Sequence, residues 1–441
     1  MTAYWCEHAV LPGGVRPSVR IVVDDDRIRD VRPDSPATEG DVRLWGVVLP
    51  GFANGHSHVF HRALRGRTHD DGGNFWSWRD AMYAVTHRLD PETYHALARA
   101  VFAEMVLAGY TAVGEFHYLH HAAGGRRYDE PNVMGRALLG AAREAGIRIT
   151  LLDSCYLAGG LTAGGHLPLD DVQQRFSDGS VEAWADRAAQ LSGDRTSRIG
   201  AAVHSVRAVP RDDLAAVAEL VGSDRRPLHV HLSEQPGENL ACEGFYGCSP
   251  TQLLAGAGLL LPATTVVHAT HLSDADVDLL AAARSTACFC PTTERDLADG
   301  IGPGRRLHDA GVPLALGSDQ HAVIDPFEEA RGVEMHERLD SLERGRFSAS
   351  DLLGMATLYG YRSLGWDEGG LLATGHLADL VAVRLDSPRT AGCDPDRVLY
   401  AATSADVTDV VVGGEHVVRG GRHRLGDVGV LLTDAISTVR R

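Results

Sequence analysis

Two histidines with one residue between them, His56 and His58, close the stretch Gly51-Phe-Ala-Asn-Gly-His-Ser-His. The apolar run Val47-Val48-Leu49-Pro50 precedes this stretch and predicts a strand that ends at the histidines. Side chains alternate along a strand, so the two imidazoles are expected to share one face. Paired imidazoles suit a divalent metal. The pair indicates a metal site only if further ligands stand at the ends of other strands.

Titratable side chains do follow other apolar runs of the sequence. His229 and His231 lie in one such run and would share a strand face, so at most one of them is expected to bind a metal directly. A single histidine is usually a hydrogen-bonded structural residue, whereas many polar groups at strand ends favour an active site. These groups are His56, His58, Glu115, His117, Tyr118, His204, Arg207, His231, Glu234, His268 and Asp319. By contrast, His120-His121 and Arg126-Arg127 indicate a solvated loop.

The apolar runs themselves predict the fold that would bring these groups together. Eight of them alternate with helical stretches, namely Trp45–Leu49, Thr111–Phe116, Ile147–Asp153, Ile199–His204, Pro227–Leu232, Thr264–His268, Thr286–Cys290 and Val312–Gly317. The helical stretches include Pro91–Ala108, Pro131–Ala145, Asp212–Val221 and Asp274–Ala283. This alternation favours an α/β fold of the TIM-like (β/α)8 barrel class, in which the chemistry sits at the C-terminal ends of the strands.

Short alternating strands near both chain ends predict a second, smaller unit. They lie at 19–31 near the N-terminus and at 379–383 and 410–418 near the C-terminus. We expect them to pair in one small β-sandwich. The expected division is residues 1–47 in the sandwich, 48–370 in the barrel, and 371–441 in the sandwich again with a closing helix at Leu432–Val439.

Composition excludes several classes of function. The chain has 441 residues and a formal net charge of −17, which argues against nucleic acid or an anionic membrane as a partner. The sequence contains no lysine, which excludes Schiff-base chemistry and a phosphate-loop lysine. Without a carbamylated lysine to bridge two metals, any metal site is expected to hold one ion. Seven scattered cysteines, no N-terminal signal and no membrane-length apolar run favour a cytoplasmic protein.

The motifs of the chain resemble the amidohydrolase superfamily. His56-x-His58, His231-x-x-Glu234, His268 and Asp319 are similar to its mononuclear deaminase branch, which also has a β-sandwich built from both termini. Within that branch the chain resembles bacterial enzymes that deaminate N-formimidoyl-L-glutamate in histidine degradation. That similarity rests on the stretches Asn74–Arg79, Gly114–His121, His204–Val209 and Val267–His271. The resemblance implies a homodimer as well.

The resemblance also implies a metal and a set of catalytic groups. A formimidoyl group is an amidine, and its hydrolysis at neutral pH needs a hydroxide, which zinc supplies by lowering the pKa of bound water to roughly 7. Asp319 would accept the proton of that water, Glu234 would protonate the leaving nitrogen, and His268 would orient the nucleophile. One Zn²⁺ per chain would be bound by His56, His58, His231 and Asp319, with a position left open for water.

The implied substrate is a small dicarboxylate, which an acidic protein must hold with local arginines. Arg207 and Arg79 are the candidates, and Tyr118 and His204 are placed to add hydrogen bonds. We expect both arginines to lie at the end of the pocket away from Glu234, so that the terminal nitrogen faces Glu234 and leaves as ammonia.

Two positions depart from the pattern of these enzymes. His61 stands where they have glutamine, and Gln320 where they often have serine. His61 is expected to bind substrate and to affect substrate preference rather than the reaction class.

Two other interpretations of the sequence stay open. A deaminase or hydrolase of the same fold could act on a cyclic amidine or amide, such as a guanine-like base or imidazolone propionate. A neutral heterocycle would not need paired arginines, which favours the linear dicarboxylate. The other interpretation is a metal-binding barrel without catalysis, and the presence of both Glu234 and Asp319 argues against it. Ammonia release from a panel of these compounds separates the interpretations.

Overall fold

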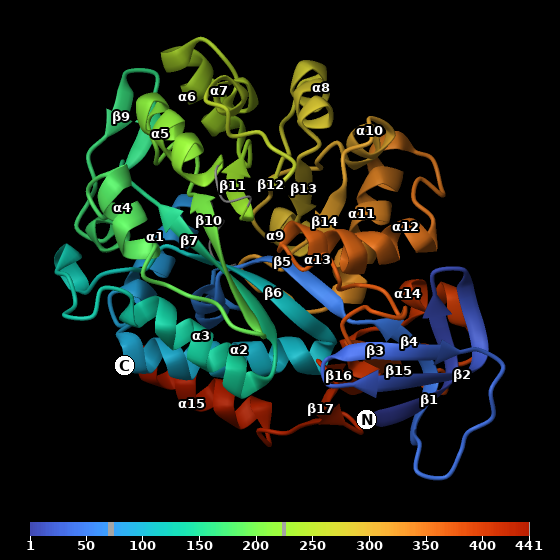
Figure 1. Ribbon diagram of the computed structural model, residues 1–441. Coiled ribbons are helices and arrows are strands. Elements are labelled where there is room, and N and C mark those ends of the chain that lie inside the picture. Colours follow the sequence, from blue (N-terminus) through green and yellow to red (C-terminus); the bar gives the residue numbers. More distant parts are fainter. Residues whose placement is uncertain (69–74, 223–225, 441) are drawn as a thin grey trace.

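The computed structural model describes residues 1–68, 75–222 and 226–440, which form a barrel with a smaller sheet beside it (Figure 1). The barrel has eight parallel strands in the order β14-β13-β12-β11-β10-β7-β6-β5. Their bounds are β5 Phe52–Ser57, β6 Tyr110–His117, β7 Arg148–Cys155, β10 Ser197–Val203, β11 Leu228–Leu232, β12 Thr264–His268, β13 Thr286–Phe289 and β14 Leu314–Leu316. The predicted (β/α)8 fold is confirmed.

The barrel closes between its first strand, β5, and the residues that follow its last strand, β14. Ser57 and Asp319 form a parallel bridge, and the amides of Ser318 and Asp319 donate to the carbonyl oxygen of His56 at 3.1 and 3.0 Å. The amide of His58 in turn donates to the carbonyl oxygen of Asp319 at 3.1 Å. The seam that closes the barrel therefore carries three of the four predicted metal ligands.

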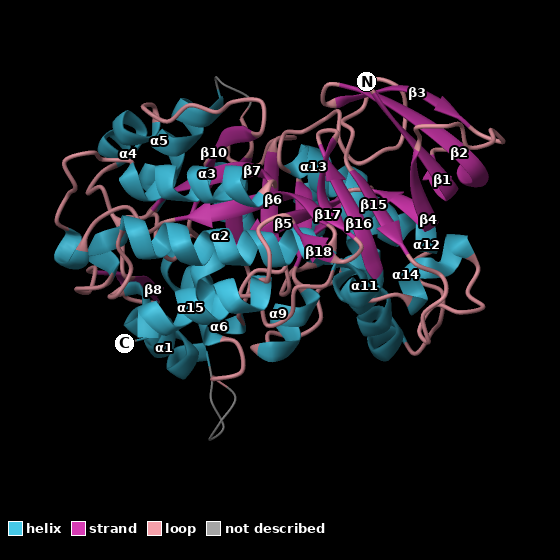
Figure 2. Cartoon of the chain, turned by 90° about the horizontal axis from the view of Figure 1, so that it is seen from below, coloured by secondary structure: helices cyan, strands magenta, loops and turns pink. Residues whose placement is uncertain are grey.

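Helices cover the outside of the barrel, and their ends follow local sequence signals. Pro91 stands in the first turn of α2 (Pro91–Ala108), Asp90 and Thr93 form its capping box, and Gly109 ends it with φ 105°. Figure 2 shows α2 beside α3 (Val133–Ala145) on one side of the barrel. The other predicted helices are α5 (Arg211–Gly222) and α8 (Asp274–Ala283), and all four agree with the prediction to within two residues at each end.

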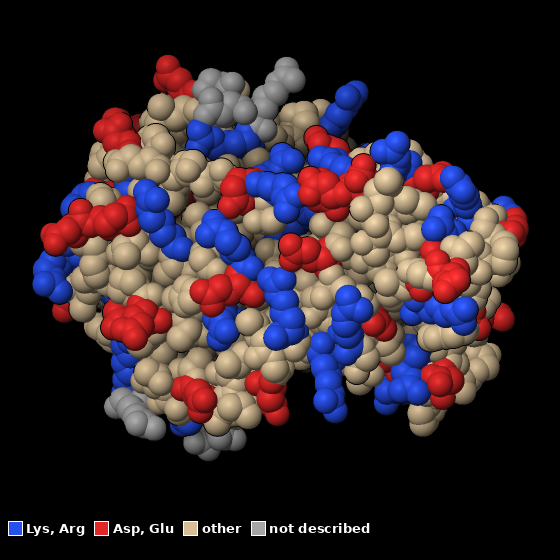
Figure 3. Space-filling view, turned by 60° about the horizontal axis from the view of Figure 1, so that its bottom comes forward, with Lys and Arg blue, Asp and Glu red and all other residues tan. Residues whose placement is uncertain are grey.

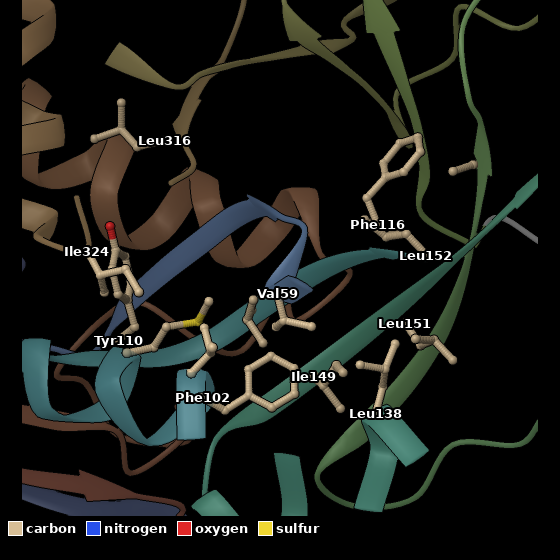
Figure 4. Close-up of a cluster of buried hydrophobic side chains, with 14 of the residues drawn as sticks. Val59, Phe102, Tyr110, Phe116, Leu138, Ile149, Leu151, Leu152, Leu316 and Ile324 are labelled. Carbon is tan, nitrogen blue, oxygen red and sulfur yellow. The ribbon is translucent and has the colours of Figure 1, made fainter. Parts of the chain in front are cut away.

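The main core lies between the barrel strands and these helices. Phe102 of α2 and Leu138 of α3 pack against Tyr110 and Ile149 of the neighbouring strands, and all four are buried (Figure 4). Burying an apolar side chain of this size contributes roughly 1.5–3 kcal/mol. The closing helix predicted at the C-terminus is α15 (Val428–Arg440), which packs on α2.

A second eight-stranded sheet joins the two ends of the chain, in the order β18-β17-β16-β15-β4-β1-β2-β3. Its two halves meet where β15 pairs antiparallel with β4. Their bounds are β1 Thr2–Leu11, β2 Gly14–Asp24, β3 Arg27–Arg32, β4 Val42–Pro50, β15 Leu380–Val383, β16 Val407–Val412, β17 Glu415–Arg419 and β18 Arg422–His423. The prediction that strands from both termini associate is confirmed, whereas the domain boundaries expected from the sequence stay a prediction.

One predicted barrel strand belongs to this second sheet. The run Trp45–Leu49 lies in β4, and the first barrel strand is β5. Val47 and Leu49 pack into the barrel core, while Leu44 and Val48 pack into the core of the small sheet. A strand that is apolar on both faces has the pattern of a buried parallel strand, which is why the sequence indicated the wrong sheet.

The surface carries many charged side chains of both signs. On the face shown in Figure 3, acidic and basic residues lie interspersed over the surface. Among the helices of the described ranges, none is both long and apolar enough to cross a membrane.

Candidate metal centre and active site

Four buried side chains converge at the seam of the barrel. His56 and His58 come from the end of β5, His231 from β11, and Asp319 from the loop after β14. Their ligand atoms all lie within 4.8 Å of one another. The structure therefore brings together the four side chains that the sequence analysis selected as metal ligands. It leaves His229 outside the group, with its Nε2 2.9 Å from the carbonyl oxygen of Ser363.

The ring hydrogen bonds explain why this group suits a cation. His58 Nδ1 lies 3.0 Å from the Phe116 carbonyl oxygen and His231 Nδ1 lies 2.8 Å from the His204 carbonyl oxygen. Both rings therefore donate from Nδ1 and carry a lone pair on Nε2. These two Nε2 atoms lie 3.3 Å apart, and a cation between them would satisfy both lone pairs.

The remaining distances fit a tetrahedral metal site. His56 Nε2 lies 3.1 Å from His231 Nε2 and 3.2 Å from Asp319 Oδ1, and His58 Nε2 lies 3.5 Å from the same oxygen. Ligand atoms that each lie about 2.0–2.1 Å from zinc at the corners of a tetrahedron are about 3.3 Å from one another. Three imidazoles and one carboxylate are also a donor set that zinc accepts.

The protonation states match those of metal ligands. Burial lowers the pKa of His56 to about 3 and also lowers the pKa of His58 and His231, so the three imidazoles are neutral. Burial alone would raise the pKa of Asp319, but the hydrogen bond from His56 and the neighbouring histidines lower it below its usual value. Neutral imidazoles and an ionised carboxylate are the forms that bind a metal ion.

A second set of titratable side chains lies beside the four candidate metal ligands. Glu234 follows β11, and its Oε1 lies 3.7 Å from Nε2 of His268, the last residue of β12. The Nδ1 atom of His268 lies 3.7 Å from Oε1 of Glu294. Burial alone would lower the pKa of His268, but these carboxylates raise it to about 10, so the ring is a cation at neutral pH. The sequence analysis missed Asp299, a buried neighbour whose pKa burial and Glu234 raise to about 8.

Both groups open into a cavity of about 510 Å³ at the C-terminal ends of the strands. Three of the four candidate ligands, His58, His231 and Asp319, lie on its lining, as do Glu234 and His268, whereas His56 lies behind it with no exposed surface. The 3-10 helix η3 (Gln173–Phe176), the hairpin β8–β9 (Gly160–Thr162 and Gly165–Leu167) and α1 (Phe75–Thr86) supply much of the remaining wall. The aromatic side chains on this wall are Trp78, Tyr83, Tyr118, Tyr156 and Phe176.

Four of the five predicted substrate-binding residues line the cavity, namely His61, Tyr118, His204 and Arg207. His61 lies in the 3-10 helix η1 (Val59–Leu64), with Nε2 3.2 Å from the Tyr118 hydroxyl. Burial lowers its pKa well below the usual value, so His61 offers a neutral imidazole. Arg79 lies in α1, but its side chain is outside the part of the chain that the structure describes.

Arg207 lies beside Glu234, not at the far end of the pocket as predicted. Its Nη2 donates to Glu234 Oε2 at 3.2 Å, and its Nε lies 3.3 Å from Glu238 Oε2. Glu238 stands in the first turn of α6 (Pro236–Tyr246), and its other oxygen accepts the amide of Ser233 at 3.0 Å. The sequence analysis missed Glu238, although its spacing of four residues after Glu234 at a helix start was a usable signal.

Two further residues that the sequence analysis missed shape the wall of the cavity. Tyr156 follows β7, its hydroxyl accepts a hydrogen bond from Gln173 at 3.1 Å, and its ring centroid lies 4.6 Å from that of His204. Arg175 in η3 is buried and donates to the carbonyl oxygens of Thr86, Leu89 and His121. It thereby joins the end of α1 to the loop after β6. These contacts connect residues far apart in the sequence, so no local sequence pattern predicts them.

The prediction of a solvated loop is wrong for His120 and His121, which are both buried. His120 Nε2 lies 2.9 Å from the Ser154 carbonyl oxygen, and His121 Nε2 lies 3.0 Å from Asp178. Asp178 also forms an ion pair with Arg187, and the residues next to His120 and His121 in the sequence give no sign of this network. Arg126 and Arg127 are exposed, as predicted.

A second set of metal-ligand residue types lies in this network, formed by His117, His120 and Asp153. Arg187 donates to both carboxylate oxygens of Asp153, at 2.8 and 2.9 Å. The guanidinium therefore already supplies the positive charge that a metal ion would bring. We assign no metal to this set.

Comparisons with known proteins match nearly the whole chain. The sequence profile of the amidohydrolase family matches residues 47–417. A formimidoylglutamate deiminase of Pseudomonas aeruginosa is 37% identical over 442 aligned residues, which cover 96% of each chain. The crystal structure of an amidohydrolase from Brucella melitensis is 32% identical and superposes over 100% of both chains with a TM-score of 0.92. An adenosine deaminase from Xanthomonas campestris with bound zinc, 23% identical, shares the fold with a TM-score of 0.83 over 100% of this chain and 98% of that one.

Proposed function

The chain belongs to the amidohydrolase family and is a hydrolase acting on C–N bonds, and from this premise we propose that it deaminates N-formimidoyl-L-glutamate in histidine degradation. The products would be N-formyl-L-glutamate and ammonia. The observation that carries the proposal is the convergence of His56, His58, His231 and Asp319 at the inner end of a cavity that Arg207 also lines. The P. aeruginosa deiminase, 37% identical over almost the whole chain, supports this substrate.

We propose that one Zn²⁺ per chain is held by these four side chains. The chemistry that zinc supplies when bound is a nucleophile at neutral pH, since it lowers the pKa of water to roughly 7. The absence of lysine from the sequence supports a single ion, because no carbamylated lysine is available to bridge two metals.

The remaining steps belong to the side chains of the protein. Asp319, ionised and at the seam, accepts a proton from the attacking water as the new C–O bond forms at the formimidoyl carbon. The His268 cation orients the attacking oxygen and stabilises the negative charge that develops on it. Glu234 delivers a proton to the terminal nitrogen, the bond from carbon to that nitrogen breaks, and ammonia leaves; Glu234 then takes back the proton of the added hydroxyl as the C=O bond of the formyl group forms. The other nitrogen stays bonded to carbon, so formyl-glutamate forms.

The experiment that tests this proposal identifies the bond that breaks. Proton NMR of the reaction mixture should show the formyl signal of N-formyl-glutamate, together with ammonia in equal amount. Formamide and free glutamate would appear instead if the nitrogen of glutamate were the leaving group, and would contradict both the role of Glu234 and the assignment.

One observation favours a second candidate, a deaminase of a cyclic amidine or amide. Tyr83, Tyr156 and Phe176 give the cavity flat aromatic walls on which a planar heterocycle could stack. Ammonia release from formimidoylglutamate, formimidoylaspartate, guanine and imidazolone propionate distinguishes the two. Turnover of a neutral heterocycle alone would replace the first candidate with the second.

A further inference from the structure

We propose that the anionic end of the substrate displaces Glu234 from Arg207, so that Arg207 exchanges one carboxylate for another and Glu234 becomes available for proton transfer. This inference rests on the proposed function, because it takes Glu234 as the proton donor and a carboxylate-bearing amidine as the substrate. It adds a determinant of specificity to the same site, because the substrate carboxylate and the Glu234 carboxylate compete for the guanidinium of Arg207.

Charge around Arg207 is the first argument for this exchange. The guanidinium already faces two carboxylates, with Glu234 Oε2 at 3.2 Å and Glu238 Oε2 at 3.3 Å. Burial alone would lower the pKa of Arg207, but these carboxylates raise it, so the single positive charge is permanent and already shared. A third carboxylate at this position meets an excess of negative charge unless one of the first two moves away.

The surroundings of the two glutamates decide which of them moves. The Glu238 side chain is wholly buried and its Oε1 is fixed by the amide of Ser233. Glu234 lines the cavity, and its Oε1 lies 3.7 Å from Nε2 of His268, toward which the carboxylate can turn. Glu238 is therefore the fixed anchor of Arg207, and Glu234 is the exchangeable partner.

The position of Arg207 itself is held by its backbone. Its amide donates to the Ser205 hydroxyl at 3.2 Å, and its carbonyl oxygen lies 3.2 Å from Nδ1 of His166 in the β8–β9 hairpin. The exchange thus needs a side-chain movement of Glu234 and no movement of the Arg207 backbone.

The exchange predicts a distinctive kinetic behaviour. An amidine without a carboxylate leaves Glu234 paired with Arg207 and so loses kcat, not only affinity. A carboxylate supplied as a separate molecule should restore this turnover. If Arg207 only binds the substrate, a separate carboxylate can compete with the substrate or do nothing, but it cannot accelerate the reaction.

The test divides the substrate into two pieces. N-methylformamidine carries the reacting group, and succinate carries the two charges. Saturating succinate should raise the rate of ammonia release from N-methylformamidine at least tenfold, whereas the neutral isostere succinamide should not. In Arg207→Met the stimulation should be absent. Inhibition by succinate, or no effect, in a protein that turns over formimidoylglutamate would overturn the exchange and leave the proposed function standing.

The anchor is tested by Glu238→Gln, which keeps the shape of the side chain and an acceptor for Ser233 but removes the charge. Arg207 then pairs with Glu234 as its one remaining carboxylate, so the stimulation by succinate should fall at least threefold. Zinc content and the temperature of unfolding should stay at their wild-type values, which separates this role from a structural one. Stimulation equal to wild type would show that Glu238 is no anchor.

A binding measurement makes the inference independent of turnover. Calorimetric titration of the zinc-loaded protein with succinate should give about tenfold tighter binding to Glu234→Gln than to wild type, because the variant has lost the competitor for Arg207. Equal or weaker binding overturns the exchange whatever the substrate is. Tighter binding in a protein that does not deaminate formimidoylglutamate would support the exchange and overturn the proposed function.

Discussion

At the scale of single residues, backbone carbonyls decide which ring nitrogens face the site. The carbonyl oxygens of Phe116 and His204 fix the tautomers of His58 and His231, so the Nε2 lone pairs point at each other. Loss of such an outer partner typically lowers metal affinity or activity by about 10–100-fold. The same strand offers a contrast, since His229 donates to Ser363 and stays outside the group.

Removal of a ligand should release the metal. Wild-type protein is expected to hold one zinc ion per chain, and Asp319→Ala should lose most of it, because the carboxylate supplies the only negative charge among the four candidate ligands. Elemental analysis of dialysed protein measures the content. His229→Gln, two residues from His231, is the matched control and should keep its zinc. Two equivalents in the wild type would contradict the single-ion site.

Removal of the proton donor should slow chemistry and leave the metal in place. Glu234→Gln should lower kcat for ammonia release by about 10²-fold or more, the usual scale for a lost general acid. Zinc content should stay at the wild-type value, since Glu234 is outside the group of four. A variant with wild-type kcat would remove Glu234 from the proton-transfer role.

At the scale of elements, the sequence indicated which strands carry the site but not what braces them. His56, His58, His231, His268 and Asp319 were found because strand ends can be read from apolar runs. The bracing residues Arg175 and Arg187 act through tertiary contacts between distant segments, and nothing in their local sequence marks those contacts, whereas Glu238 had a usable signal in its spacing after Glu234. The error at Trp45–Leu49 has the same origin, because burial on both faces does not reveal which sheet covers each face.

The loops after β6 and β7 are braced by Arg187 of α4 (Val181–Ala188), which pairs with Asp153 and Asp178. Burial alone would raise the pKa of both carboxyls, but Arg187 lowers the pKa of Asp153, and the hydrogen bond from His121 together with Arg187 lowers that of Asp178. Their contribution to stability is therefore present above the unfolded pKa of about 3.9 and is lost as the pH falls through the lower folded pKa.

Arg187→Met should test this brace. The change leaves the buried carboxylate of Asp153 without its cation and Asp178 with Arg127 alone, at 3.7 Å, and should lower the free energy of unfolding at pH 7 by about 3–5 kcal/mol. Without Arg187, burial raises the pKa of these carboxyls, so they become protonated at a higher pH in the variant than in wild type. Protonation removes the cost of burying their charge, and the variant therefore regains stability as the pH falls. The difference from wild type should therefore narrow between pH 7 and pH 4 in urea titrations. A difference independent of pH would contradict the electrostatic explanation.

At the scale of the whole molecule, one carboxylate joins the small sheet to the barrel. Asp379 stands just before β15, and its side chain accepts from Arg148 of β7 at 2.9 Å, from the Tyr361 hydroxyl at 2.6 Å and from the Gly413 amide at 2.6 Å. Its carbonyl oxygen accepts the amide of Gly51, between β4 and β5, at 2.9 Å. The two sheets are thus fixed to each other at the point where the chain passes from one to the other. The homodimer implied by resemblance stays a prediction.

Asp379→Ala should therefore destabilise the entire chain, because it leaves the guanidinium of Arg148 buried without a counter-charge. We expect a loss of about 3–5 kcal/mol in the free energy of unfolding, measured by urea titration followed by circular dichroism. Asp386→Ala, which removes an exposed carboxylate from Arg384, is the control and should change little. Adding Arg148→Met to Asp379→Ala should recover part of the loss, since no unpaired charge then remains in the interior. If the double variant is no more stable than Asp379→Ala, the loss comes from packing or from the bonds to Tyr361 and Gly413. The junction would then be held by those contacts rather than by the ion pair.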